Sequence, residues 1–349
     1  FKQKTAYEIR LSLVGSEMCI RDSIHIIGNG SSNSGCWLRV SGYHRLLAHI
    51  ILRQLKIPCS ALNGELDQIY IAKLLAMIRG SELTHGVILA HENVYDDCGK
   101  IVEGFGSFYV PNDYVLRLAR EHSEFLPGVS IHPGRPDAID ELERCLEAGA
   151  VLMKCLPNCQ NIDCSDPRYT RFWQRMADAK LPLLAHTGGE LSVPVYNRRF
   201  ADPSFLRLPL ECGVNVIAAH CGTNSLVFDR NYFGVFCEMI ERYPNLYGDN
   251  SGMQTPFRSR HFPRLLAPEI MRRIVHGSDF PIPISGLWAR LRGLINCEAA
   301  RAASRSDNLL ERDLDLKRAM GFDGATFTRA WSLLRLGSEP AVYSCLQKS

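Results

Sequence analysis

The sequence predicts an α/β protein: a (β/α)8 TIM barrel with an insertion after the first strand and a C-terminal helical segment. Short apolar runs alternate with longer amphipathic stretches, which is typical of a parallel sheet covered by helices. Eight such units in 349 residues fit a closed barrel with insertions better than an open doubly wound sheet. No Gly-x-Gly-x-x-Gly follows the first run, which weakens the dinucleotide-binding alternative.

The predicted strands are the apolar runs at 24–27, 86–91, 127–132, 150–155, 181–186, 214–219, 245–249 and 273–276. Helical patterns separate most of these strands, for example at 138–148 and 169–179. In the insertion at 33–85 we predict helices near 43–55 and near 66–79. The closing segment at 283–336 is also predicted to be helical. Asp137 and Asp166 precede two of these patterns as predicted N-caps. The sequence holds no internal repeat or low-complexity linker, so we predict one domain over 23–349.

Residues 1–22 are predicted not to belong to this domain. The chain begins with Phe, and the segment Leu-Ser-Leu-Val-Gly-Ser-Glu-Met-Cys-Ile-Arg-Asp-Ser resembles translated sequencing-adapter DNA. It lacks the layout of a signal peptide. We therefore expect the chain to be a fragment, and residues 1–22 to be a non-native read-through or a disordered extension.

Composition excludes several classes of protein. A hydrophobic fraction of 46% supports a sizeable core, and a net charge of +3 with interspersed signs is unlike the basic face of a nucleic-acid binder. No apolar run reaches the roughly 18 residues that span a bilayer. The thirteen cysteines form no CxxC pair, and several, including Cys155, Cys221 and Cys237, lie in or beside apolar runs. We expect buried free thiols and a reducing, cytoplasmic location.

Histidine or aspartate stands at the ends of four predicted strands: His25, His186, His220 and Asp279. The carboxyl ends of barrel strands meet at one mouth, so we predict one metal-centred site there, with Lys154 also present. Imidazole and carboxylate suit Zn²⁺ or a similar divalent ion. Such an ion lowers the pKa of its water to about 7, and a neighbouring carboxylate moves the proton. A single strand-end histidine is more often structural, but the shared position of these residues favours a common site.

Other residues near the predicted mouth rank lower. Glu190 would orient a ligand or contact substrate, and a solvated loop acid is the alternative. Trp37 would wall the mouth, and Arg198 would bind a carboxylate, although adjacent arginines are usually surface charge. Further candidates for the pocket are His132, Asp249, Asn250 and Arg199.

Five segments in one order resemble the amidohydrolase superfamily, specifically the amidohydrolase-related branch that also contains non-oxidative decarboxylases. They span about residues 24–336 and read His-Ile-Ile-Gly-Asn-Gly, Lys-Cys-Leu-Pro-Asn-Cys-Gln-Asn-Ile-Asp, Ala-His-Thr-Gly-Gly-Glu, Ala-His-Cys-Gly and His-Gly-Ser-Asp-Phe-Pro. The resemblance implies a mononuclear or binuclear site with His25, His186 and Asp279 as metal ligands. It implies that His220 polarises the substrate or assists the metal, and that Asp279 is the proton shuttle. Lys154 stands where some relatives carry a carbamylated lysine that bridges two metals; a plain ammonium that binds an anionic substrate is the alternative.

The chain departs from this family at its first motif, Asp-x-His-x-His. With His25 at the second histidine, Ser23 occupies the first and Arg21 the aspartate. A serine hydroxyl replaces imidazole poorly, so the chain as written lacks one expected ligand. We interpret this as an assembly junction and predict that Ser23→His raises zinc affinity and activity together.

These observations predict a metal-dependent hydrolase that cleaves a C–N or C–O bond of a small molecule with metal-activated water, most plausibly with Zn²⁺. The alternatives are a non-oxidative decarboxylase of a small aromatic or enoic acid at the same site, and a catalytically impaired small-molecule-binding barrel if Ser23 is genuine. We expect a small-molecule substrate and neither nucleic acid nor membrane as partner. The sequence leaves the oligomeric state open, a homo-oligomer included.

Overall fold

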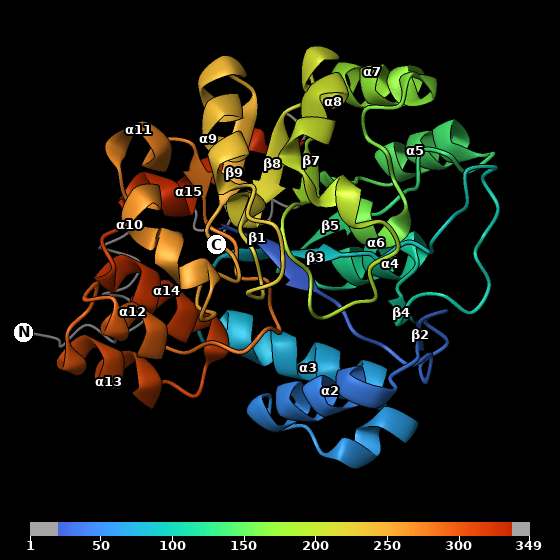
Figure 1. Cartoon of the computed structure of the whole chain (residues 1–349). Coiled ribbons are helices and arrows are strands. Elements are labelled where there is room, and N and C mark those ends of the chain that lie inside the picture. Colours follow the sequence, from blue (N-terminus) through green and yellow to red (C-terminus); the bar gives the residue numbers. More distant parts are fainter. Residues whose placement is uncertain (1–19, 337–349) are drawn as a thin grey trace, which may run out of the picture.

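A computed structural model describes residues 20–336, which form an eight-stranded parallel sheet that curls into a barrel with helices around it (Figure 1). The strands, in their order in the sheet, are β1 (Ile20–His25), β3 (His85–Leu89), β5 (Phe125–Val129), β6 (Leu152–Cys155), β7 (Leu183–His186), β8 (Val216–Ala219), β9 (Leu246–Asp249) and β10 (Ile274–Val275). A parallel bridge between Ile24 and Phe280 joins the two ends of the sheet, and the N–H of His25 donates to the carbonyl of Phe280 at 2.8 Å. The predicted barrel is confirmed.

The first strand begins earlier than predicted. β1 begins at Ile20, not at residue 24, and both Ile20 and Arg21 pair with β3. The polar residues 21–23 concealed this strand in the sequence, and its register shifts by a bulge between Arg21 and Ile24. Residues 20–22, which we had assigned to the extension, therefore belong to the sheet. The rest of that segment, 1–19, lies outside the described residues.

Helices follow the strands and cover the outside of the sheet. They are α3 (Leu66–Arg79), α4 (Asn112–Glu121), α5 (Ala138–Glu147), α6 (Pro157–Gln160), α7 (Thr170–Asp178), α8 (Arg207–Glu211), α9 (Phe233–Arg242), α10 (Phe262–Leu265) and α11 (Pro268–Met271). The apolar stripe of α7 shows why they pack there, since Phe172, Trp173 and Met176 lie on one face and are buried. Short 3₁₀ turns occur at η2 (Pro167–Tyr169), η3 (Arg198–Ala201), η4 (Pro203–Leu206), η5 (His220–Gly222) and η6 (Arg258–His261).

Two segments extend the barrel as predicted. The insertion after β1 contains β2 (Trp37–Leu38), α2 (Gly42–Gln54) and η1 (Cys59–Asn63), and β2 pairs antiparallel with β4 (Phe108–Tyr109). The helix α2 lies on the side of the barrel opposite α7 and α9 (Figure 1). The C-terminal segment contains α12 (Leu287–Leu291), α13 (Cys297–Arg305), α14 (Leu309–Ala319) and α15 (Gly324–Leu333).

The alternation of side chains along each strand explains how polar groups reach the site. Alternate strand residues form a small apolar cluster that is separate from the core under the helices; its strand members include Val87, Leu89, Leu152, Leu184, Ile217 and Val275. Lys154 follows Leu152 by two positions, and His186 follows Leu184 by two. Because residues two apart on a strand face the same way, both polar side chains lie above this apolar layer.

Two further expectations concern the described residues only. Within 20–336, no helix combines the length and the apolar character needed to cross a bilayer. Every cysteine in that range is a free thiol; Cys155 and Cys221 are buried as predicted, whereas Cys237 is partly exposed.

Candidate active site

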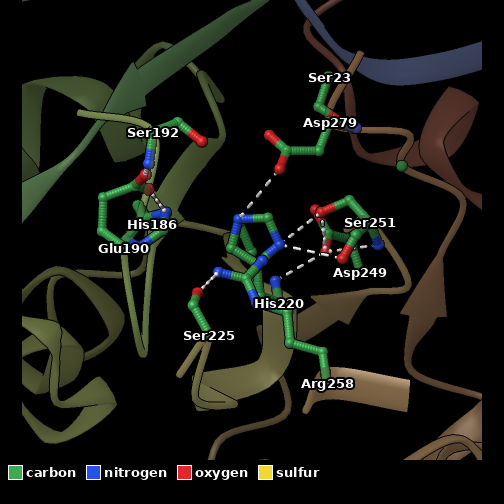
Figure 2. A network of polar contacts seen from close by, with 12 residues as sticks. Ser23, His186, Glu190, Ser192, His220, Ser225, Asp249, Ser251, Arg258 and Asp279 are labelled. Carbon is green, nitrogen blue, oxygen red and sulfur yellow. Dashed lines mark hydrogen bonds and ion pairs between the residues drawn. The ribbon is translucent and has the colours of Figure 1, made fainter. Parts of the chain in front are cut away.

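The four residues predicted to converge at one mouth of the barrel lie together. Figure 2 shows three of them, His186, His220 and Asp279. Asp279 stands between two imidazoles: its Oδ1 is 3.4 Å from Nε2 of His25, and its Oδ2 is 3.9 Å from Nε2 of His220. The rings of His220 and His186 are 4.9 Å apart between centroids. Residues from β1, β7 and the turns after β8 and β10 therefore face one another across a few ångströms.

The turn that carries Asp279 is held by Ser23. Asp279 has a φ of 57°, in the left-handed region that a residue with a side chain rarely adopts. The Ser23 Oγ accepts hydrogen bonds from the backbone N–H groups of Ser278 at 3.1 Å and Asp279 at 3.0 Å. Strained backbone of this kind persists where its surroundings fix it, and it clusters at functional sites. Ser23 thus positions the turn that presents the carboxylate.

His220 is fixed in the same way by β9 and the loop after it. Its φ is 62°, and its backbone N–H donates to Oδ1 of Asp249 at 2.8 Å. Its Nδ1 lies 3.0 Å from the carbonyl of Ser251 and 2.9 Å from that residue's Oγ. Figure 2 shows the ring between these groups and Asp279. The contacts to Nδ1 orient the ring so that Nε2 faces Asp279.

His186 has one ring nitrogen engaged and one free. Its Nδ1 lies 3.4 Å from Oε2 of Glu190, and its buried Nε2 has no hydrogen-bond partner among the described residues. Oε1 of Glu190 is occupied by three backbone N–H groups of its own loop, including that of Val193 at 3.2 Å. A carboxylate on one imidazole nitrogen with the other left open is the usual arrangement around a metal-binding histidine.

Arg258 is a component that the sequence did not reveal. It is 5% exposed, and its Nη2 donates to the carbonyl of Gly189 at 2.6 Å and to Ser225 Oγ at 2.7 Å. A Cβ placed on Gly252, whose φ is +59°, would stand 2.7 Å from Nη1 of Arg258 and 3.2 Å from Oδ2 of Asp279. Nη1 of Arg258 and Oδ2 of Asp279 are thus at most about 5.9 Å apart. Arg258 begins the short turn η6, in a segment whose arginines resemble surface charge, so no sequence signal points to it.

Burial and mutual charge set the ionisation of these groups. Burial raises the pKa of Asp279, but His220, His25 and Arg258 outweigh it and hold that pKa well below its usual range. Burial, followed by the charge of Arg258, lowers the pKa of His220 to about 4. Burial and the neighbouring His220 also lower the pKa of His186. Near neutral pH the Asp279 carboxylate is therefore ionised and the His186 and His220 imidazoles are neutral, so the lone pairs of these two rings are available to an ion.

Two more buried groups lie within electrostatic reach. Lys154 is 2% exposed, and its charge lowers the pKa values of His186, His220 and His91. His91 stands at the end of the apolar run 86–91, as the site histidines stand at the ends of theirs. The sequence therefore contained a signal that could have predicted His91 as a neighbour of the site. Burial lowers its pKa to about 3, and its ring stacks on Phe108 at 4.0 Å.

A cavity of about 120 Å³ opens beside the site. His25, Asp279 and Glu190 line its polar end. The rest of its wall is mostly aliphatic and comes largely from the insertion after β1, including Leu38, Leu47 and Ile51. A small molecule in this cavity would thus contact the site residues at one end only.

The remaining predicted pocket residues lie elsewhere. His132 is buried, but its Nδ1 accepts from Gly134 N–H at 3.0 Å and its Nε2 faces the carbonyl of Asn161 at 3.3 Å. Trp37 stacks on Tyr109 beside the cavity, while its neighbour Leu38 lines it. Arg198 lines a second cavity, which shares Glu190 with the first. Arg199, Asp249 and Asn250 do not line the main cavity.

The donor atoms fit a divalent ion in kind. Two ligands about 2.0–2.1 Å from a tetrahedral zinc ion stand roughly 3.3–3.4 Å apart, which matches the 3.4 Å between His25 and Asp279. The unpartnered Nε2 of His186 supplies a third donor of the right chemistry. Within residues 20–336, however, no three His, Cys, Asp or Glu side chains form a closed metal-binding group. The donor atoms are therefore of the right chemical kind, but they do not stand close enough together to form a complete metal-binding group.

We expect Ser23→His to raise zinc affinity by about tenfold or more, since a lost ligand should matter at least as much as a lost supporting contact. Ser23→Ala is the matched control: both substitutions remove the acceptor of two buried N–H groups, at roughly 1–3 kcal/mol, and only one adds an imidazole. Zinc titration and elemental analysis measure the difference. Equal zinc binding by the parent and both variants would show that position 23 is not a missing ligand.

Comparisons with known proteins identify the family and support the fold. The sequence model of a family described as Amidohydrolase matches residues 93–320. The comparison with curated proteins found no match. Among solved structures, an uncharacterized TIM-barrel protein from Bordetella bronchiseptica is 13% identical with a TM-score of 0.56, covering 87% of this chain and 99% of its own. A putative 2-pyrone-4,6-dicarboxylic acid hydrolase from Pseudomonas putida is 14% identical with a TM-score of 0.54, covering 91% and 98%.

A third similar structure is 2,6-dihydroxybenzoate decarboxylase from Rhizobium, which is 14% identical with a TM-score of 0.45 and covers 89% of this chain and 100% of its own. At these identities a structural likeness shows the fold and not the reaction. The two structures with TM-scores above 0.5 support the barrel. The family match, which spans more than half of the chain, carries the assignment of the family.

Proposed function

The chain belongs to the amidohydrolase family, and from that premise we propose that it is a metal-dependent hydrolase that cleaves a C–N or C–O bond of a small molecule. The observation that carries the proposal is the meeting of His25, His220 and Asp279 beside the open Nε2 of His186 at the end of one cavity. These side chains would hold the ion, which we propose is Zn²⁺. When bound, such an ion lowers the pKa of water to about 7 and polarises a carbonyl.

The chain's own residues supply the proton transfers. Asp279 is ionised near neutral pH, so its carboxylate takes the proton of the attacking water and delivers it to the leaving nitrogen or oxygen. His220 faces the same carboxylate through Nε2, and the lone pair of this nitrogen would help to hold the ion. Glu190 fixes the His186 ring through Nδ1. Arg258 stabilises the ionised form of Asp279 by its charge.

The test is a comparison of hydrolysis before and after removal of metal. We expect the purified protein to cleave members of a panel of uncharged esters, lactones and amides. Dialysis against a chelator should abolish cleavage, and stoichiometric Zn²⁺ should restore it. A matched panel of aromatic and enoic acids, assayed for CO₂, tests the alternative.

Three outcomes count against the proposal. Release of CO₂ without hydrolysis would replace it by decarboxylation at the same site. If the chelator did not change the rate of hydrolysis, the metal would have no part in the reaction. Absence of stoichiometric metal and of any turnover would favour a small-molecule-binding barrel, in which Ser23 is the native residue.

A further inference from the structure

The cavity beside the site differs sharply between its two ends. At one end stand His25, Glu190 and Asp279. Among the described residues that line the cavity, none is lysine or arginine, and the titratable groups are the carboxylates of Glu190 and Asp279 and the imidazoles of His25 and His44. Lys154 and Arg258, the buried cations nearby, are not part of its wall. A second anionic group on a ligand would therefore find no lysine or arginine in the wall to pair with.

One face of α2 is a large part of the apolar wall. The lining residues Leu47, Ala48, Ile51 and Leu52, together with the polar His44 one turn earlier, recur at the three- and four-residue spacing of a single helical stripe. Leu46, one position away, points outward and is 61% exposed. Facing walls are supplied by Phe108 of β4 and by Val193 of the loop that Glu190 organises. The insertion after β1 thus determines the chemistry of the pocket.

We propose that the substrate of this site carries an uncharged, apolar group on its non-reacting side, such as an aromatic ring or a branched alkyl chain. As a statement about the substrate, this inference rests on the proposed function. A charged group would lose its hydration in the cavity without gaining a partner, which is strongly unfavourable. An apolar cavity of about 150 Å³ accommodates benzene, so about 120 Å³ corresponds to a group of roughly five or six carbons.

The experiment measures binding and needs no turnover. Three probes share a hydroxymethyl end on a benzene ring and differ only at the far end: 4-methylbenzyl alcohol, 4-carboxybenzyl alcohol and 4-(aminomethyl)benzyl alcohol. Calorimetric titration of the full chain in the presence of Zn²⁺ gives three dissociation constants. We expect the methyl probe to bind at least about tenfold more tightly than either charged probe.

Two variants of α2 form a matched pair. Leu47→Gln places an amide in the wall and should weaken the methyl probe by roughly tenfold, whereas Leu46→Gln makes the same change on the exposed face and should leave its affinity within about twofold. Val40→Thr is the milder second variant in the wall, in case Leu47→Gln fails to fold, and should weaken binding in the same direction. Thermal unfolding of each variant shows that it is folded.

Equal binding of the three probes, no binding of the methyl probe, or equal effects of Leu46→Gln and Leu47→Gln would overturn the inference. Because no reaction is measured, this failure is distinct from failure of the proposed hydrolysis. If the protein ranks the probes as expected but cleaves no ester, lactone or amide, the inference about the pocket stands and the proposed hydrolysis is wrong. If it hydrolyses charged and uncharged substrates equally well, the proposed hydrolysis stands and the inference about the pocket is wrong.

Discussion

Asp279→Asn should lower turnover by about 10²- to 10⁴-fold while the protein stays folded, because an amide cannot accept and return the proton. The substitution preserves the shape of the side chain, and the turn is held through backbone N–H groups that it does not alter. It also removes a charge that faces His25 and His220, so metal affinity should fall as well. Steady-state kinetics on a substrate identified in the panel gives the magnitude, and thermal unfolding gives the fold.

Asp202→Asn is the control for this substitution. Asp202 lies in the loop after β7, accepts from the N–H of Ser204 at 2.9 Å and lines neither cavity beside the site. Asparagine caps such a turn equally well, so its activity should match that of the parent. Turnover of Asp279→Asn within threefold of the parent would remove this carboxylate from the mechanism.

Asp313→Ala should destabilise the protein by about 3–5 kcal/mol, the usual cost of leaving a buried charge without its partner. Asp313 is 1% exposed, and its Oδ2 lies 2.9 Å from Nζ of the fully buried Lys317 and 3.8 Å from Nε2 of His276. Gln254 also donates to this carboxylate. Lys317 donates in turn to the carbonyl of Gly277, in the segment that leads to Asp279. Denaturant unfolding measures the loss.

Asp315→Ala is its matched control, since it makes the same change two residues later on α14, where the side chain is partly exposed. We expect an effect within about 0.5 kcal/mol there. Replacing the pair together, as Asp313→Leu with Lys317→Met, should recover part of the loss, because neither charge is then left alone. If Asp313→Ala costs less than 1 kcal/mol, the buried pair does not support the fold as we describe.

The strands were predictable because both faces of a barrel strand are buried. Apolar runs such as 181–186 and 214–219 therefore stand out, and the polar residue after each run marks the mouth. His186, His220 and Asp279 were found in this way. The start of β1 was predicted too late in the sequence because Arg21 and Ser23 are polar. Backbone hydrogen bonds pair this part of the strand with β3, and such bonds require no pattern of apolar side chains.

Other parts of the site depend on contacts that no local pattern encodes. The burial of Arg258 requires Gly189 and Ser225, which come from two other loops. The hydrogen bonds of Ser23 require the turn after β10, so its sequence position suggested only a missing ligand. In both cases the partner is a backbone or loop group tens to hundreds of residues away.

The contact that closes the barrel also sets when the site can exist during synthesis. Ser23 and the N–H of Asp279 are 256 residues apart in the chain. At about 5–20 residues per second, a ribosome needs roughly 13 to 50 s to travel between them. Throughout that interval β1 has only one neighbouring strand, and the growing sheet ends in an unpaired edge on either side. A nascent chain thus contains His25 long before it can assemble a site around it, and its most aggregation-prone period ends only as the last strand is made.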